Sequence, residues 1–261
     1  MAIILGLVLI ALVAPLLASH DPLRVDLPNR LRAPDREHPF GTDEVGRDIY
    51  SRVVYGTRIS LQIGVGIIAL AAMVGTLLGL TAGYLGGKAD DFLMRAMDMI
   101  LAFPSLVLAL ALTAALKPSL ANAMFSIALV KIPVYARLAR GQALVLKEQE
   151  YVLAARSLGA GLSRTLFRHI LPNSLSPILV QASMGMGEAI LIAASLSFIG
   201  LGAQPPTPEW GAMISTGRKY LMDQWWYPTF PGLAIALTVM GFNLFGDGLR
   251  DLLDPRRRGR A

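Results

Sequence analysis

The feature that most constrains this chain is a set of long stretches without a charged side chain. Ile59–Leu85 is uncharged throughout, and so is Ala2–Ala18. A helix needs roughly 20 mostly apolar residues to cross a bilayer. Only 16% of the 261 residues are charged, whereas soluble domains average about 25%. Together with the absence of cysteine, this excludes a disordered chain and a disulfide-stapled module, and it makes an ordinary soluble enzyme a poor match.

Six segments can be interpreted as membrane spans, and together they predict an all-α, polytopic membrane protein. They run over Ala2–Ala18, Ile59–Leu85, about Arg95–Leu116, about Leu120–Leu138, Ile178–Leu201 and about Phe230–Phe245. We expect Pro104 to kink the third span. The second span contains five glycines, which should let neighbouring helices approach closely. These are Gly64, Gly66, Gly75, Gly79 and Gly83.

The first segment has an alternative interpretation as a secretory signal peptide. No basic region precedes its apolar run, and Ala18-Ser19-His20 is a poor match to a cleavage site with small residues. We therefore expect an uncleaved span. The apolar run starts directly after Met1, which leaves open whether a cytoplasmic tail precedes it.

The distribution of basic residues predicts the orientation. The net charge is +6, and Arg137–His169 holds six Lys and Arg against two acids. A second basic cluster, Arg256-Arg257-Arg258, follows the last span. Basic residues favour the cytoplasmic side, so we expect both segments and the C-terminus there. The pI near 9.8 then indicates a membrane surface and a docking partner rather than nucleic acid.

The stretch Glu150–Pro172 has the most distinctive local pattern. Glu150–Leu158 favours a helix, Gly159 and Gly161 supply a break, and Ser163 can cap a second helix that ends at Pro172. The pattern predicts two short amphipathic helices joined at a glycine bend and projecting from the membrane. The alternative is an ordinary basic loop at the lipid surface.

This stretch resembles the EAA signature of ABC importer permeases. The resemblance rests on Ala154-Ala155-x-x-x-Gly159 followed by Leu171-Pro172. Leu153 and His169 depart from the signature, which has Glu and Ile at those positions. Four more stretches, between His38 and Arg256, are similar to the oligopeptide/dipeptide/nickel branch of that family. They are 38–52 with 56–61, Leu196–Gly202, Gln204–Gly211 and Phe242–Pro255.

The resemblance implies a six-helix type I ABC importer transmembrane domain that forms half of a translocation pathway for peptides. Nickel or another small solute is the alternative cargo. The implied partners are a homologous second permease, two ABC ATPases, an external solute-binding protein and the lipid bilayer. The implied location is a bacterial or archaeal cytoplasmic membrane. The chain itself would be non-catalytic and bind no cofactor, with ATP and Mg on the ATPases, and it contains no Gly-x-x-x-x-Gly-Lys-Ser/Thr loop.

The same resemblance implies which residues couple to the ATPases and how the chain is divided. The coupling residues would be Glu150, Ala154, Ala155, Arg156, Gly159, Leu171 and Pro172. The expected divisions are a first transmembrane helix at 1–18, an external loop with an amphipathic segment at 19–58, a transmembrane core at 59–250 with the EAA loop at about 148–173, and a basic cytoplasmic tail at 251–261. An ATP-independent secondary transporter or channel is the alternative from a different class, but it has no need of such a docking loop.

Two groups of residues have competing interpretations. Glu188, near the middle of the fifth span, should face the bundle interior because a membrane charge is costly. Lys131 is its possible partner, and the pair is either a tie between helices or part of the pathway. Glu188 could also replace an acid that the family resemblance leads us to expect at Ala193. The three tryptophans, Trp210, Trp225 and Trp226, form an interfacial aromatic belt or, alternatively, an external gate or docking surface.

Two further patterns are expected to be structural or neutral. Asp43–Arg58 carries acids and bases at helical spacing, including Asp48 and Arg52 four residues apart. We expect a helix lying along the outer surface there. The histidines His20, His38 and His169 are scattered along the chain, so no metal site is expected.

Overall fold

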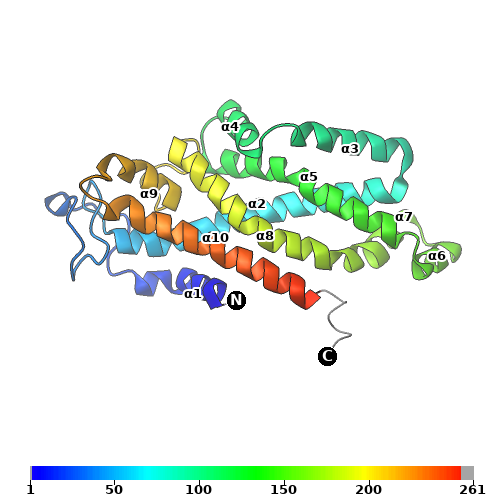
Figure 1. Ribbon diagram of the computed structural model, residues 1–261, viewed down its shortest axis with the longest axis horizontal. Coiled ribbons are helices and arrows are strands. Elements are labelled where there is room, and N and C mark those ends of the chain that lie inside the picture. Colours follow the sequence, from blue (N-terminus) through cyan, green and yellow to red (C-terminus); the bar gives the residue numbers. More distant parts are fainter. Residues whose placement is uncertain (1, 254–261) are drawn as a thin grey trace.

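The longest helix begins where an aspartate caps it. The computed structural model describes residues 2–253, and in it Asp48 accepts a hydrogen bond from the backbone N–H of Ser51 at 2.8 Å. Helix α2 (Ile49–Leu85) starts at this cap and continues for 37 residues. At 1.5 Å per residue it is about 55 Å long, so it runs along most of the molecule (Figure 1).

The other helices pack around α2 and alongside one another (Figure 1). They are α1 (Ala2–Leu17), α3 (Gly87–Leu101), α4 (Ser105–Ala115), α5 (Leu120–Leu146), α6 (Glu150–Ser157), α7 (Leu162–Thr165), α8 (Leu171–Ile199), α9 (Trp210–Gly217) and α10 (Trp226–Leu253). Short 3₁₀ turns lie at Leu27–Asn29 and Arg218–Tyr220, and a π-helical turn lies at Leu166–Ile170. The predicted all-α fold is confirmed.

Glycines bring α2 and α5 into close contact. A Cβ atom added to Gly75, Gly79 or Gly83 would lie 2.6, 2.1 or 2.7 Å from a backbone carbonyl oxygen of α5. These three glycines recur every four residues and so line one face of α2. A Cβ atom added to Gly64 would meet the side chain of Ile190 of α8, and one added to Gly66 would meet the side chain of Met124 of α5. The prediction that the glycines allow close helix approach is confirmed.

Length and composition single out fewer membrane crossings than the six predicted segments. Among the described residues, three helical stretches are long and apolar enough: Ile49–Leu85, Leu162–Ile199 and Trp226–Leu252. Helices α3 and α4 together form a fourth candidate, which is bent by 92°. The predicted kink at Pro104 is therefore a full break, which makes this pair a broken span or a re-entrant loop. Helix α1 is apolar but has only 16 residues, and α5 carries Lys131, Arg137 and Arg140.

The predicted surface helix over Asp43–Arg58 is wrong. Residues 43–48 form turns before the Asp48 cap, and α2 starts at Ile49 and passes through position 58 without a break. Asp43, Arg47, Asp48 and Arg52 are all buried. The expected division at 58/59 therefore falls inside a helix. The division at 250/251 also falls inside a helix, since α10 extends to Leu253, and the cluster Arg256-Arg257-Arg258 lies outside the described residues.

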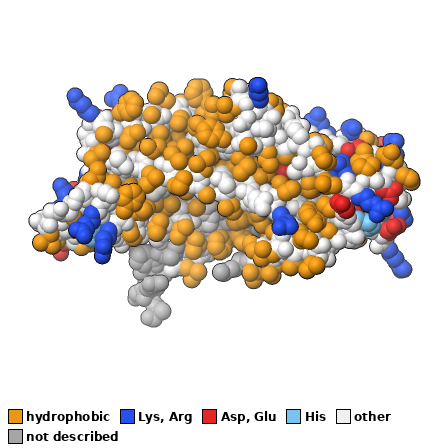
Figure 2. Space-filling view, turned by 180° about the vertical axis from the view of Figure 1, so that it is seen from behind, with side chains coloured by type: hydrophobic (Ala, Val, Ile, Leu, Met, Phe, Trp, Pro, Cys, Tyr) orange, Lys and Arg blue, Asp and Glu red, His pale blue; other side chains and the backbone are white. Residues whose placement is uncertain are grey.

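The surface divides into an apolar middle and two charged ends. Figure 2 shows apolar side chains across most of the face, with Lys, Arg, Asp and Glu gathered mainly toward the ends. One end, which we call the cap, consists of residues 18–48, α9 and the first turns of α2 and α10. The other, the α6 end, contains α6, α7 and the π-helical turn (Figure 1). An apolar belt between two polar ends is typical of a protein that crosses a membrane several times.

Candidate functional site

Polar contacts join the end of α2 both to the end of α5 and to α6. The Lys147 ammonium, just after α5, donates to the carbonyl oxygen of Gly83 near the end of α2 at 3.1 Å. The Arg156 guanidinium of α6 lies over the ring of Tyr84, 5.8 Å from its centroid. The end of α2 therefore lies in contact with both α6 and the end of α5.

Gly159 forms the bend between α6 and α7, as predicted. Its φ is +84°, a left-handed conformation in which a Cβ atom is unfavourable. The Gly159 N–H donates to the carbonyl of Arg156 at 2.9 Å, and the Ala160 N–H donates to the carbonyl of Ala155 at 3.0 Å. These two bonds make a Schellman motif, which ends a helix by satisfying its last carbonyls. The requirement at this position is for backbone conformation, because an added Cβ would meet nothing within 4 Å.

The second helix does not end at Pro172 as predicted. It begins at Leu162 with Gly161 before it, so Ser163 lies inside it and is not its cap. A π-helical turn at Leu166–Ile170 then leads directly into α8, and Pro172 occupies the first turn of α8. Side chains satisfy the carbonyls that this junction frees. Asn173 Nδ2 donates to the His169 carbonyl at 2.6 Å, and Ser174 Oγ donates to the Ile170 carbonyl at 2.8 Å.

The element combines a buried anchor with an exposed apolar face. Its buried side chains are Val152, Thr165, Leu166 and Ile170. Its exposed large apolar side chains, which we call the apolar face, are Tyr151, Leu153, Leu158, Leu162 and Phe167. Leu158 is 89% exposed. Large apolar side chains exposed on a protruding element are a feature of protein–protein contacts.

The predicted coupling residues lie on α6, at the Gly159 bend and in the first turn of α8, and their exposure differs. Glu150, Ala154, Arg156 and Pro172 are exposed, whereas Ala155 and Leu171 are half-buried. Leu158 and Phe167 were not among the predicted residues. The sequence contained a signal for them, since large apolar side chains in a basic stretch outside the predicted spans indicate a contact with another protein.

Lys131 and Glu188 form the predicted ion pair between α5 and α8. The Lys131 side chain is buried, but 56% of the Glu188 side chain is exposed, so the acid does not face the interior of this chain as expected. Glu188 shares a face of α8 with Leu191, which lines apolar grooves beside α10. Ala193, by contrast, is buried in the core, so Glu188 does not occupy the place of Ala193.

A pair of variants separates the two roles of this ion pair. Glu188→Gln should lower the stability of the chain by about 1–3 kcal/mol, because the buried Lys131 ammonium loses its counter-charge. Lys131→Met combined with Glu188→Gln should regain most of that stability. Thermal unfolding and cargo uptake are measured on both variants. If the ion pair only links α5 to α8, uptake recovers together with stability in the double variant. If Glu188 belongs to the translocation pathway, uptake stays low in the double variant.

The predicted roles of the tryptophans require correction at two positions. Trp210 is fully buried, and its indole N–H donates to the carbonyl of Val53 at 3.0 Å. Trp226 is buried in the same cluster. Neither side chain is therefore available to an aromatic belt or to an external partner. Trp225 is 53% exposed and stays a candidate for either role.

Glu209 caps the N-terminus of α9. Its carboxylate accepts hydrogen bonds from the backbone N–H groups of Gly211 at 3.0 Å and Ala212 at 2.8 Å. Burial is the largest influence and raises its pKa above the ordinary 4.5, although these N–H groups act in the opposite direction.

The raised pKa of Glu209 predicts how stability changes with pH. The folded state holds the Glu209 proton more tightly than the unfolded state does, so protonation of Glu209 stabilises the folded state. This stabilisation is complete below pH 4.5 and is lost as the pH rises through the folded pKa. Glu209→Gln should remove that part of the dependence. We expect the difference in unfolding temperature between wild type and variant to change across this range. Parallel profiles from pH 4 to 7 would contradict the assignment.

Comparisons with known proteins show the family and agree with the fold. Residues 75–259 match a family described as "Binding-protein-dependent transport system inner membrane component". The chain is 56% identical to a probable D,D-dipeptide transport system permease protein, DdpC, of Escherichia coli (strain K12), over 99% of this chain and 87% of that protein. It is 50% identical to the dipeptide transport system permease protein DppC of Alkalihalophilus pseudofirmus (strain ATCC BAA-2126 / JCM 17055 / OF4), over 98% of this chain and 84% of that protein.

Two solved structures share the fold. One is the MetNI methionine ABC transporter in inward-facing conformations, with a TM-score of 0.55 and 16% identity over 75% of this chain and 95% of that chain. The other is an amino acid ABC transporter crystallised with histidines, with a TM-score of 0.51 and 19% identity over 79% of this chain and 94% of that chain.

Proposed function

Because the chain belongs to the family of binding-protein-dependent transport system inner membrane components, we propose that its α6 end couples the membrane helices to ATPase subunits. The chain is a permease subunit of an ABC peptide importer and a multi-pass membrane protein. The observation that carries the coupling proposal is the apolar face, which is exposed on a projecting element that contacts the end of α2 through Arg156, where Lys147 links α2 to the end of α5.

The coupling mechanism follows from how this element is attached. An ATPase subunit would bind the apolar face, with the exposed Glu150 and Arg156 at its edge. Closure of two ATPase subunits on ATP would then move α6 and α7 as a rigid unit. The close contact of α2 with α5 would convert that movement into a switch between two packed arrangements of the bundle. ATP and Mg²⁺ would be bound by the ATPase subunits, and the remaining partners would be a homologous second permease and an external solute-binding protein.

The orientation proposed is that the α6 end is cytoplasmic and the cap is external. Helix α10 runs from the cap toward the α6 end (Figure 1), which would place the C-terminus in the cytoplasm. The basic residues of Arg137–His169 support the same side.

The proposed cargo is a short peptide of two or three residues. The relatives are named for D,D-dipeptides, dipeptides, di- and tripeptides, and glutathione. These compounds share peptide bonds and a small size, and we take that shared chemistry as the cargo class.

Reconstitution tests this function. The chain is co-expressed with a homologous permease and the ATPases encoded beside it, purified by a tag on this chain, and placed in proteoliposomes with the solute-binding protein. We expect both ATPases to co-purify and labelled dialanine to be taken up only with hydrolysable ATP. Uptake by the chain without ATPases, driven by an ion gradient, would instead establish a secondary transporter.

A further inference from the structure

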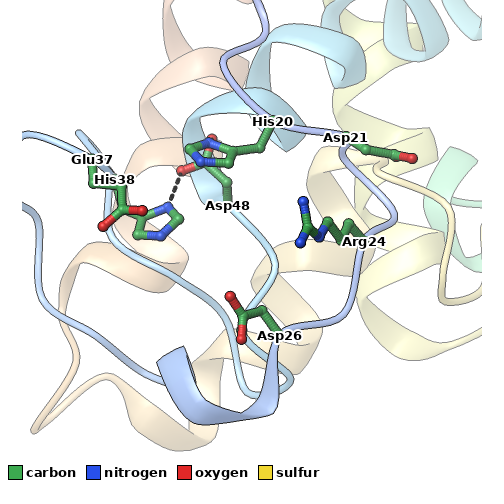
Figure 3. Close-up of a pocket in the computed structure, with 8 residues that line it drawn as sticks. His20, Asp21, Arg24, Asp26, Glu37, His38 and Asp48 are labelled. Atoms are coloured by element: carbon green, nitrogen blue, oxygen red, sulfur yellow. Dashed lines mark hydrogen bonds and ion pairs between the residues drawn. The ribbon is translucent and has the colours of Figure 1, made fainter.

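The cap brings together three side chains that are far apart in the sequence. His20 follows α1, whereas Glu37 and His38 lie in the loop that leads to α2. One potential ligand atom from each lies within 4.8 Å of the others. The two imidazole rings stack with centroids 4.7 Å apart (Figure 3). The expectation that the histidines are scattered is therefore wrong for this pair, and His169 lies at the opposite end near Tyr151.

Asp48 fixes the orientation of His38. The buried Asp48 carboxylate lies 3.0 Å from His38 Nδ1. A carboxylate only accepts hydrogen bonds, so Nδ1 donates in this contact and Nε2 is the ring nitrogen left to face a ligand. Asp48 is itself held by the N–H of Ser51 at 2.8 Å and by its hydroxyl at 2.6 Å. A carboxylate behind an imidazole is the arrangement that orients histidine ligands in metal sites.

The surroundings of the three side chains favour a cation. They line a cavity of about 120 Å³ together with Asp21, Arg24, Asp26, Gly46 and Asp48 (Figure 3). Four of its lining residues are acidic and Arg24 is the basic one. The Arg24 guanidinium points into the cavity from the side opposite the loop that carries Glu37 and His38 (Figure 3). Glu37 is already paired with Arg32, whose Nη1 lies 3.0 Å from Glu37 Oε2, so an incoming ion must take this carboxylate from Arg32. The other lining carboxylates, those of Asp21, Asp26 and Asp48, outnumber Arg24 and leave the cavity negative.

We propose that His20, Glu37 and His38 bind a divalent transition-metal ion of the Zn²⁺ class in the cap. Two imidazoles and a carboxylate suit Zn²⁺ and its neighbours, whereas Mg²⁺ and Ca²⁺ prefer oxygen ligands alone. Ligand atoms around a tetrahedral Zn²⁺ ion are roughly 3.4 Å apart. The side chains of Glu37 and His20 are 60% and 31% exposed, so they can close around an ion while Asp48 holds His38 in place.

The bound ion would join segments that the backbone connects only through the long cap loop. It would link the residue after α1 to the loop and, through His38 and Asp48, to the first turn of α2. The proposed transport function requires no metal, so this site is additional to it and either conclusion can fail without the other.

Zinc binding to the assembled transporter tests the proposal. The complex of permeases and ATPases, stripped with EDTA and placed in nanodiscs, is titrated with Zn²⁺ alone by calorimetry, and bound zinc is counted by mass spectrometry. A complex carrying His20→Ala with Glu37→Gln corrects for zinc on other subunits. We expect one additional zinc per copy of this chain in the wild type, and about tenfold or greater loss of affinity in each single variant.

The matched control is His169→Ala, which removes the remaining histidine of the chain but no residue of the cavity. His169 lies near Tyr151 at the opposite end of the molecule. We expect its zinc affinity to stay within about twofold of wild type. Equal zinc content in wild type and double variant would overturn the proposal, as would an equal loss in His169→Ala. If His20→Ala fails to assemble, Glu37→Gln decides by the same criterion.

Discussion

Replacing Gly159 with valine is expected to reduce ATP-driven uptake by roughly tenfold while the protein still inserts into the membrane. Gly159 has a φ of +84°, and this left-handed conformation costs a residue with a Cβ atom about 1–2 kcal/mol. That cost shifts the bend by roughly 5- to 30-fold toward other conformations. The apolar face depends on the bend, because Leu158 lies before it and Leu162 after it.

The control for this prediction is Gly159→Asn. Asparagine adopts the left-handed conformation more readily than other residues with a side chain. Neither substitution creates a steric clash, since an added Cβ meets nothing within 4 Å. We therefore expect Asn to retain most of the uptake and of the coupling between ATP hydrolysis and transport. If Val and Asn both behave as the wild type, the bend has no role in coupling.

Gly79→Ala is expected to destabilise the bundle by about 1–3 kcal/mol, which is the usual cost of overpacking. The added Cβ would lie 2.1 Å from the carbonyl oxygen of Ala136. Both atoms belong to regular helices, so neither can yield without moving a backbone. Because α2 and α5 form a glycine-lined interface along much of their length, the change should lower the unfolding temperature in detergent.

Gly141→Ala is the matched control for that measurement. Gly141 lies in α5, and a Cβ added there meets nothing within 4 Å. The substitution should be neutral or stabilise the helix by about 0.5–1 kcal/mol, as it does at other open helical positions. Equal unfolding temperatures for the two variants would contradict the close contact between α2 and α5.

The helices could be predicted, and so could the close helix approach at the glycines of α2, because the apolar pattern and the size of each residue can be read from the sequence nearby. The start of α2 could not be predicted. The charges of Asp43–Arg58 have helical spacing, yet Arg47 Nε lies 2.6 Å from Asp43 within a buried cluster, and Arg52 donates to the carbonyls of Pro22 and Pro206. These partners are up to 154 residues away, and sequence spacing carries no information about them.

The same limit applies to the candidate sites. The position of the coupling element and the conformation of Gly159 could be predicted, since a helix–glycine–helix pattern is local. The burial of Trp210 could not, because it depends on Gly56 leaving space for the indole ring. The histidine pair was missed for a similar reason: His20 and His38 are brought together by the return of the cap loop to the first turn of α2.

Crosslinking from Leu158 tests the central claim most directly, which is that the apolar face contacts an ATPase. The chain contains no cysteine, so Leu158→Cys introduces a unique thiol on this subunit at a side chain that is 89% exposed. The control is Met222→Cys, which is 95% exposed between α9 and α10.

Both variants are assembled with the ATPases and treated with a short maleimide–succinimidyl ester reagent that joins the thiol to nearby lysines. The account predicts a covalent adduct between this chain and an ATPase subunit from position 158 and none from position 222. Absence of the adduct at position 158 in a complex that hydrolyses ATP and takes up peptide, or an equal adduct at position 222, would contradict it.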